Sequence, residues 1–173
     1  MTSDNRDLLF LKEALPQMQE YLLSNELYWP LGAAMHRLTP GSVLLSLARL
    51  QGSLPSEVQN IRQQLESIRG KWRAAWDKKA AREISNRLRL WSNFLADYAN
   101  APEQCAGAYP GEVRGRVILQ LLLLEAPDAP DNAALAELDG MLKTRLHPDR
   151  FLWDAGLQVI FPKENFWFLY GKL

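Results

Sequence analysis

The fold is decided by the segment Val117-Ile-Leu-Gln-Leu-Leu-Leu-Leu124, in which Gln120 is the one polar residue. A helix built on this segment has almost no polar face, and such helices lie inside bundles, surrounded by other helices. Pro110 is suited to the first turn of this helix, which is expected to run to about Glu125. The sequence therefore predicts an all-α bundle with this helix at its centre.

Helix signals flank the central segment on both sides. Apolar residues recur every three or four positions from Asp7 to Ser24, and Pro16 inside this pattern marks a kink or a late start. Thr39-Pro40 has the form of an N-cap followed by a first helical residue. A further helix is expected from Asp131 to about Leu146. Together these signals predict a bundle of about five helices, one of them long.

The longest helical pattern runs from Pro55 to Tyr98. Its apolar residues follow a heptad-like spacing up to Trp72 and then recur every four residues from Trp76 to Leu88. Spacing by fours drifts around an α-helix, so the two halves face different neighbours. Either one continuous helix meets different partners at its two ends, or the helix breaks near Gly70 or Asp77. The sequence leaves both alternatives open.

The C-terminal segment has a different character. Gly156 to Phe161 and Phe166 to Tyr170 are rich in aromatic and branched residues, with a Pro-containing turn between them. This pattern predicts a short hairpin or an extended tail docked on the helices. We expect a single domain over residues 1–173, with 151–173 as an aromatic appendage packed on the bundle.

The composition is that of an ordinary globular chain. Of its 173 residues 47% are hydrophobic, and 20 basic side chains balance 20 acidic ones. This balance gives no overall attraction to nucleic acid or to anionic membranes. The apolar runs are shorter than the roughly 20 residues that cross a bilayer, and the start of the chain lacks a secretory pattern. With Cys105 as the one cysteine, the protein is expected in the cytoplasm.

Residues suited to catalysis or metal binding are sparse. His36, Cys105 and His147 are the only histidines and cysteine, and none lies three or four residues from another. The glycines form no phosphate-binding loop, and the carboxylates form no pair in an apolar setting. We therefore predict no metal site, no cofactor and no catalytic residue. An enzyme is the third alternative, which a deep pocket lined by His36 or His147 with carboxylates would revive.

A basic stretch is the first candidate contact surface. Residues 62–89 contain nine basic and three acidic side chains. Because their spacings are seven, four and seven, four of the basic residues fall into one stripe of a helix: Lys71, Lys78, Arg82 and Arg89. Such a stripe can bind phosphates by releasing counterions, or it can be a solvated helix face. A nucleic-acid-associated accessory protein is thus the alternative function.

Aromatic residues outside the long helix are the second candidate surface. Aromatic rings that keep one edge in water are enriched at protein interfaces, although they can equally plug the ends of a bundle or line a small-molecule pocket. The candidates for partner binding are Tyr28, Trp29, Trp153, Trp167 and Tyr170. From these features we predict a protein-interaction or scaffold module that self-associates as a homo-oligomer or binds another protein.

One tripeptide suggests a more specific interaction. His147-Pro148-Asp149 follows the last predicted helix and resembles the histidine-proline-aspartate loop of J-domain co-chaperones. That resemblance would imply engagement of a chaperone partner. It is confined to this loop, because the preceding helix is not the basic helix of that family and no clear third helix follows. Proline and aspartate after a helix end are also an ordinary stop-and-turn signal.

Overall fold

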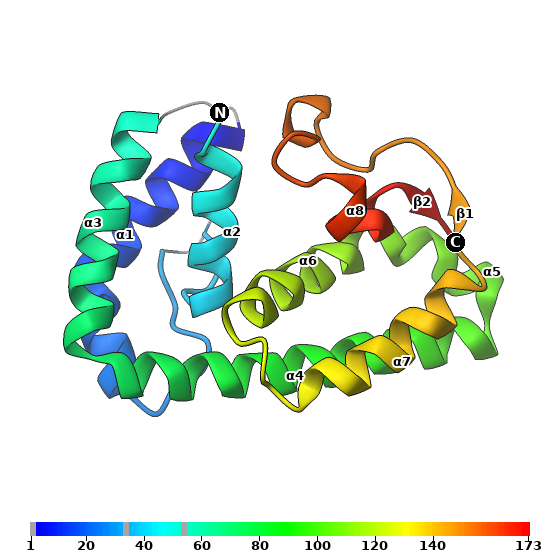
Figure 1. Ribbon diagram of the computed structural model, residues 1–173, viewed down its shortest axis with the longest axis horizontal. Helices are drawn as coiled ribbons and strands as arrows, with labels where there is room; N and C mark the ends of the chain where they lie inside the picture. The colour runs from blue at the N-terminus through cyan, green and yellow to red at the C-terminus, as the bar shows by residue number, and fades with distance from the viewer. Residues whose placement is uncertain (1–2, 33–34, 53–54) are drawn as a thin grey trace. The chain divides into compact units, whose positions relative to one another are not determined.

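The computed structural model describes residues 3–32, 35–52 and 55–173. The described chain is mostly helical, which confirms the all-α prediction, and its helices are more numerous than the five or so expected (Figure 1). The α-helices are α1 (Ser3–Leu23), α2 (Pro40–Leu50), α3 (Pro55–Lys71), α4 (Arg73–Asn100), α5 (Pro102–Cys105), α6 (Tyr109–Glu125), α7 (Asp131–Lys143) and α8 (Lys163–Phe166).

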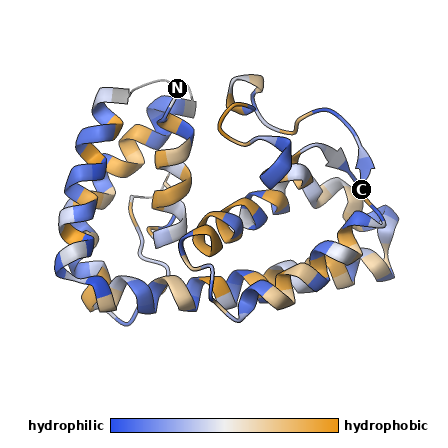
Figure 2. Ribbon diagram, viewed as in Figure 1, coloured by the Kyte–Doolittle hydropathy of each residue, from blue (hydrophilic) through white to orange (hydrophobic). Residues whose placement is uncertain are grey.

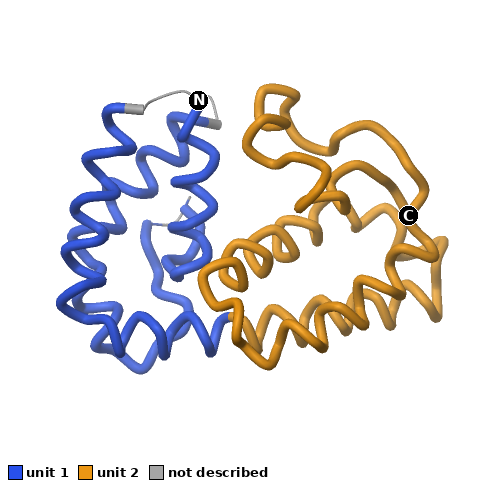
Figure 3. The backbone as a smooth tube through the Cα atoms, viewed as in Figure 1, with its two compact units in different colours: residues 1–83 blue, residues 84–173 orange. Residues whose placement is uncertain are grey.

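The contacts divide the chain into two compact units, Met1–Glu83 and Ile84–Leu173 (Figure 3). Helix α4 contributes its first turns to unit 1 and the remainder to unit 2. A single domain over residues 1–173 stays a prediction, and each unit is described by itself.

Unit 1 is a helical cluster of α1, α2, α3 and the first turns of α4. Helix α1 continues through Pro16, so that residue is neither its start nor its end. One apolar core joins the four helices, with fully or almost fully buried side chains from each of them: Leu11, Met18, Tyr21, Val43, Leu50, Leu65 and Trp76. The predicted helix start at Thr39-Pro40 is confirmed.

The first turn of α2 is held by a buried carboxylate from α4. Thr39 caps the helix by accepting a hydrogen bond from the Ser42 amide at 3.0 Å. The Thr39 hydroxyl donates to Glu83 Oε1 at 2.7 Å, and the Gly41 amide donates to Glu83 Oε2 at 2.8 Å. The Glu83 side chain is 0% exposed. Because a helix N-terminus favours negative charge, Glu83 ties α4 firmly to the start of α2.

Lys79, one turn before Glu83, holds the connector that follows α1. Its ammonium donates to the carbonyl of Glu26 and, at 3.3 Å, to Ser24 Oγ. It also lies 4.4 Å from the centre of the Tyr21 ring, a cation–π arrangement. Burial, with Arg82 nearby as the second cause, lowers the pKa of Lys79. The two residues of α4 thus fix the segments at both ends of the connector between α1 and α2.

We expect Glu83→Gln to destabilise the protein by about 2 to 3 kcal/mol, because a charged acceptor of two buried hydrogen bonds becomes an amide whose nitrogen faces a donor. Urea denaturation measures this free energy of unfolding. The control is Glu66→Gln on α3, whose side chain is 67% exposed and pairs with Arg69 at 3.2 Å, and which should change stability by less than about 0.5 kcal/mol. Equal effects of the two substitutions would contradict the role given to Glu83.

The long helical pattern of 55–98 is broken, as one of the two alternatives predicted. Helix α3 ends at Lys71 and α4 begins at Arg73, close to Gly70, and the two helices meet at a sharp corner (Figure 1). Backbone hydrogen bonds continue across the corner, from the Trp72 amide to Ile68 at 2.9 Å and from the Trp76 amide to Trp72 at 3.0 Å. The change of apolar spacing after Trp72 therefore marks a bend rather than a gap in the chain.

Unit 2 is organised around α6. The ribbon of its second half is coloured mostly as hydrophobic in Figure 2. The buried side chains include Val117, Ile118, Leu119, Leu122 and Leu123. The expectation that the run is buried all round is wrong at its end, where Leu124 is 55% exposed. Leu124 belongs to the last turn of the helix.

A buried guanidinium joins α6 to its neighbours. Arg116 is 1% exposed and binds Asp139 of α7 through two hydrogen bonds, Nε to Oδ1 at 3.2 Å and Nη2 to Oδ2 at 2.8 Å. Its Nη1 donates to Gln120 at 3.0 Å, and the guanidinium lies 4.1 Å from the centre of the Phe168 ring. Burial lowers the pKa of Arg116, and Asp139 opposes that effect. One side chain therefore connects α6, α7 and the C-terminal segment.

The C-terminal segment is compact rather than a hairpin of its own. It consists of the 3₁₀-helices Ala155–Leu157 and Trp167–Leu169 around α8, so the predicted hairpin of 156–161 with 166–170 is wrong. The adjacent residues Phe168 and Leu169 are both fully buried. A strand would point neighbouring side chains to opposite faces, whereas a tight helical turn allows both to enter one core.

A small antiparallel pairing closes the end of the chain. Strand β1 (His147–Pro148) pairs with β2 (Gly171–Lys172) in the register His147 with Lys172 and Pro148 with Gly171. A Cβ atom on Gly171 would lie 2.6 Å from the Leu146 side chain, so this close approach requires glycine. Tyr109 at the start of α6 donates its hydroxyl to the carbonyl of Phe168 at 2.6 Å, which attaches the segment to α6.

We expect Asp139→Ala to destabilise the protein by about 3 to 5 kcal/mol, because it leaves the Arg116 charge buried and uncompensated. The double substitution Arg116→Met with Asp139→Leu should recover most of that loss, since it removes the charge together with its partner. Urea denaturation of the two variants measures both effects. A double variant no more stable than Asp139→Ala would show that the ion pair itself, and not the unpaired charge, sets the cost.

Candidate functional site

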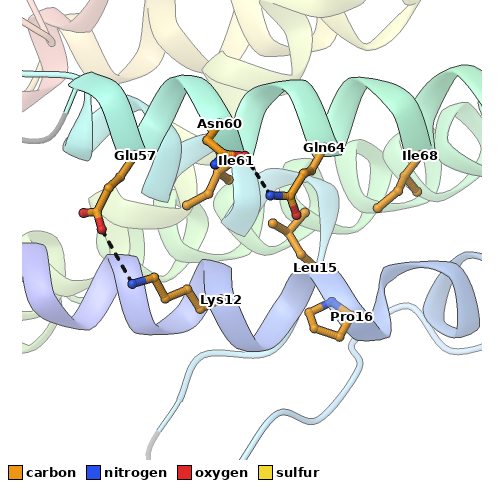
Figure 4. A pocket seen from close by; sticks show the side chains of 8 residues that line it. All are labelled: Lys12, Leu15, Pro16, Glu57, Asn60, Ile61, Gln64 and Ile68. Atoms are coloured by element: carbon orange, nitrogen blue, oxygen red, sulfur yellow. Dashed lines mark hydrogen bonds and ion pairs between the residues drawn. The ribbon is translucent and has the colours of Figure 1, made fainter.

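The candidate site is a groove between α1 and α3 in unit 1. Helix α1 packs chiefly along α2, and its looser contact with α3 leaves a groove of about 350 Å³. Leu15 from α1 points towards α3, and Ile61 and Ile68 from α3 point towards α1 (Figure 4). Leu15 and Ile68 are only partly buried although they touch the core. The groove thus has an apolar floor open to solvent.

Polar side chains form the rim of the groove. Lys12 and Glu57 approach to 3.7 Å at one end, an exposed ion pair of small energy. Further along, Gln64 donates to Asn60 Oδ1 at 2.9 Å (Figure 4). Exposed Pro16 lies on the α1 side and has no amide hydrogen, so the Lys12 carbonyl lacks its usual helical donor. The rim can therefore exchange hydrogen bonds with a chain lying on the floor.

The aromatic candidates in unit 1 are half-buried. Trp29 donates from Nε1 to Gln17 at 2.9 Å, and its ring meets Tyr21 edge-on at 6.4 Å. Its backbone pairs with that of Leu38. Tyr28 is also partly buried. Both rings lie in the connector after α1, which Lys79 fixes, and their binding to a partner stays a prediction.

The aromatic candidates in unit 2 contact the C-terminal segment itself. Trp153 lies edge-on to Phe161 at 5.2 Å, and Tyr170 donates its hydroxyl to the Phe161 carbonyl at 2.9 Å. Trp167 carries the Lys143 ammonium 5.0 Å from its ring centre. The side chains of Trp153, Trp167 and Tyr170 are all partly buried. They are used at least in part for packing, which is the alternative that the sequence left open.

The four residues of the basic stripe are exposed but do not share one straight helix. Lys71 ends α3, whereas Lys78, Arg82 and Arg89 lie on α4, beyond the corner at Trp72. Arg82 donates to the Asn25 carbonyl at 3.1 Å and Arg89 to Asn86 at 2.8 Å. Nucleic-acid binding by this stripe stays a prediction. The four side chains lie on two helices and therefore do not follow a single helix axis.

The side chains that could bind a metal ion lie apart from one another in the described part of the chain. Within residues 3–32, 35–52 and 55–173, no three His, Cys, Asp or Glu side chains are grouped as a metal ion would need. His36 and His147 are exposed, and His147 lies in β1. None of the helices in that part of the chain is long and apolar enough to span a membrane.

The tripeptide at 147–149 has a local structural use. Its first two residues form β1, and Asp149 accepts from the Arg150 amide at 2.8 Å and pairs with Lys172 at 3.3 Å. The Arg150 amide and Lys172 lower the pKa of Asp149. These contacts fit the stop-and-turn interpretation of the tripeptide.

Sequence patterns did not reveal the groove. Leu15 belongs to the apolar stripe of 7–24 and Ile68 to the heptad of 55–72, so both read as core residues. A pattern along one helix says nothing about how far the next helix stands from it. The available signal was Pro16, an unusual residue on the same helix face as the groove.

Comparisons with known proteins add no family to this geometry. No family model matches the chain, and neither a curated protein nor a solved structure matches it. The case for a function therefore rests on the residues themselves.

Proposed function

We propose that this protein is a protein-interaction module that self-associates, with the α1–α3 groove of one copy receiving an apolar turn of a second copy. The observation that carries the proposal is the apolar floor of the groove, in which Leu15 and Ile68 are only partly buried beside the buried Ile61. Apolar side chains that can be covered at no conformational cost to the protein are typical of binding sites for protein segments.

The rim chemistry favours a peptide chain as the occupant. Asn60 and Gln64 each carry both a donor and an acceptor, which is what a peptide backbone requires from its neighbours. Lys12 and Glu57 present both signs of charge, so the rim selects neither a strongly acidic nor a strongly basic ligand. A largely apolar segment with an exposed backbone fits these features better than an ionic small molecule does.

The chain itself displays a segment of this kind. Val159 is 87% exposed, the highest value among the exposed large hydrophobic side chains of the described residues. It lies in a turn that is held in shape, since the amides of Ile160 and Phe161 both donate to the Leu157 carbonyl, at 3.0 and 2.9 Å. A preformed apolar turn loses little conformational entropy on binding. A second copy therefore supplies a suitable occupant.

The proposal is tested by light scattering over a range of protein concentration. The mass should rise above that of the 19.7 kDa chain as concentration increases, and Val159→Asp should return it to the monomer. Pro16→Glu should do the same from the groove side: it places a carboxylate beside the floor and restores a helical amide at an exposed position. Both substitutions lie at exposed positions, so the fold should persist, as circular dichroism would verify.

Matched controls separate the groove and the turn from a general effect of charge. Gln158→Asp changes an exposed neighbour in the same turn, and Gln19→Glu adds a negative charge at an exposed position elsewhere on α1. Both control variants should associate as the unchanged protein does. A strict monomer at every concentration would overturn self-association, and association that survives Val159→Asp would overturn this turn as the occupant.

A further inference from the structure

Two amide side chains on the rim of the α1–α3 groove keep hydrogen-bonding capacity that the protein itself does not use. Gln64 donates from Nε2 to Asn60 Oδ1 at 2.9 Å, and neither side chain makes another hydrogen bond among the described residues. Asn60 Nδ2 therefore remains a free donor, and Gln64 Oε1 remains a free acceptor. Both residues are exposed and line the groove, so a ligand can reach these atoms.

The bond between the two amides holds them beside the apolar floor. Asn60 and Gln64 lie four residues apart on α3, so their side chains share one face of the helix. The Gln64 amide extends towards Leu15 of α1 in Figure 4. Because the pair is already fixed, a ligand that covers Leu15 meets these polar atoms without further ordering of the side chains.

The apex of the Val159 turn offers the complementary groups on one residue. The neighbouring amides of Gln158 and Ile160 donate within the turn, at 3.2 and 3.0 Å. In contrast, neither the amide nor the carbonyl of Val159 has a hydrogen-bond partner among the described residues. Val159 is also 87% exposed. One residue thus presents an apolar side chain, a free donor and a free acceptor to an approaching surface.

Charges beside the turn complement those on the rim of the groove. Lys163 and Glu164 at the start of α8 are exposed and form no ion pair among the described residues. Lys12 and Glu57 on the rim are 57% and 46% exposed and approach each other only to 3.7 Å. Each surface carries one charge of each sign, so each charge can face its opposite in a second copy.

We propose that the Asn60–Gln64 pair selects the occupant of the groove by binding the backbone of Val159 in a second copy. Gln64 Oε1 accepts from the Val159 amide, and Asn60 Nδ2 donates to the Val159 carbonyl. The Val159 side chain packs against Leu15 and Ile68. This inference rests on the proposed function and adds its specificity-determining residues. An apolar turn whose apical backbone is already bonded within itself would leave both rim amides without partners.

Gln64→Met tests the acceptor, because methionine keeps the length of the side chain but not its hydrogen bonds. The dissociation constant for self-association, measured by light scattering, should rise about tenfold. The control is Gln63→Met, an exposed neighbour on α3 that does not line the groove. It should leave the dissociation constant unchanged.

Asn60→Asp tests the donor. A carboxylate still accepts from Gln64, but it cannot donate to the Val159 carbonyl and repels it, so the dissociation constant should rise at least about tenfold. The control is Gln59→Glu, which adds the same charge at an exposed neighbour outside the groove. It should associate as the unchanged protein does.

The Val159 amide reports the contact directly in protein labelled with ¹⁵N-valine, with its signal assigned from Val159→Ile. Its proton signal should move downfield as concentration rises, because the amide gains an acceptor, and Gln64→Met should remove this shift under conditions where it still associates. A signal that does not move on association would overturn the backbone contact.

The variants separate this inference from the proposed function. If Val159→Asp abolishes association but Gln64→Met and Asn60→Asp do not weaken it, the groove stands and selection by the amide pair is overturned. An equal loss in the Gln59 and Gln63 controls would overturn selection as well. Association that survives Val159→Asp, or a strict monomer, would overturn the proposed function and this inference with it.

Discussion

The buried carboxylate of Glu83 is the constraint on which unit 1 depends. A fully buried charge is tolerated only where donors surround it, and those donors are the Thr39 hydroxyl and the Gly41 amide. Their positions require α2 to begin at one place beside α4. Once α2 is placed, α1 packs along it, and the separation of α1 from α3 that remains is the groove.

In unit 2 a buried cation positions the neighbouring elements, as the Glu83 carboxylate does in unit 1. The Arg116 guanidinium needs acceptors on every side, and Asp139 and Gln120 provide them while Phe168 covers its face. Hydrophobic contacts alone would allow α7 and the C-terminal segment to slide along the leucine-rich surface of α6. The fixed geometry of a two-bonded ion pair allows only one register. In both units, a single ionic side chain converts apolar attraction into a defined arrangement.

Much of the fold could be predicted from local signals. The Thr39 cap and the burial of most of Val117 to Leu123 follow from neighbouring residues in the chain, whereas the bend after Trp72 was one of two alternatives that the apolar spacing left open. The tail could not be predicted, because the burial of Phe168 and Leu169 depends on a surface formed by α6. Arg116 did leave a trace, since it lies three residues from the core positions Val113 and Leu119, but the sequence alone does not name its partner. The groove could not be predicted from the sequence, because it depends on the distance between α1 and α3.

The α1–α3 groove is an apolar recess that the protein's own side chains leave partly open. Hydrogen–deuterium exchange at low and at high protein concentration tests self-association through the groove most directly. Amides of residues 12–15, 57–68 and 156–160 should exchange more slowly at high concentration, whereas those of α7 should not change. Exchange that is independent of concentration in all three segments, or slowing confined to other parts of the chain, would contradict the proposed function.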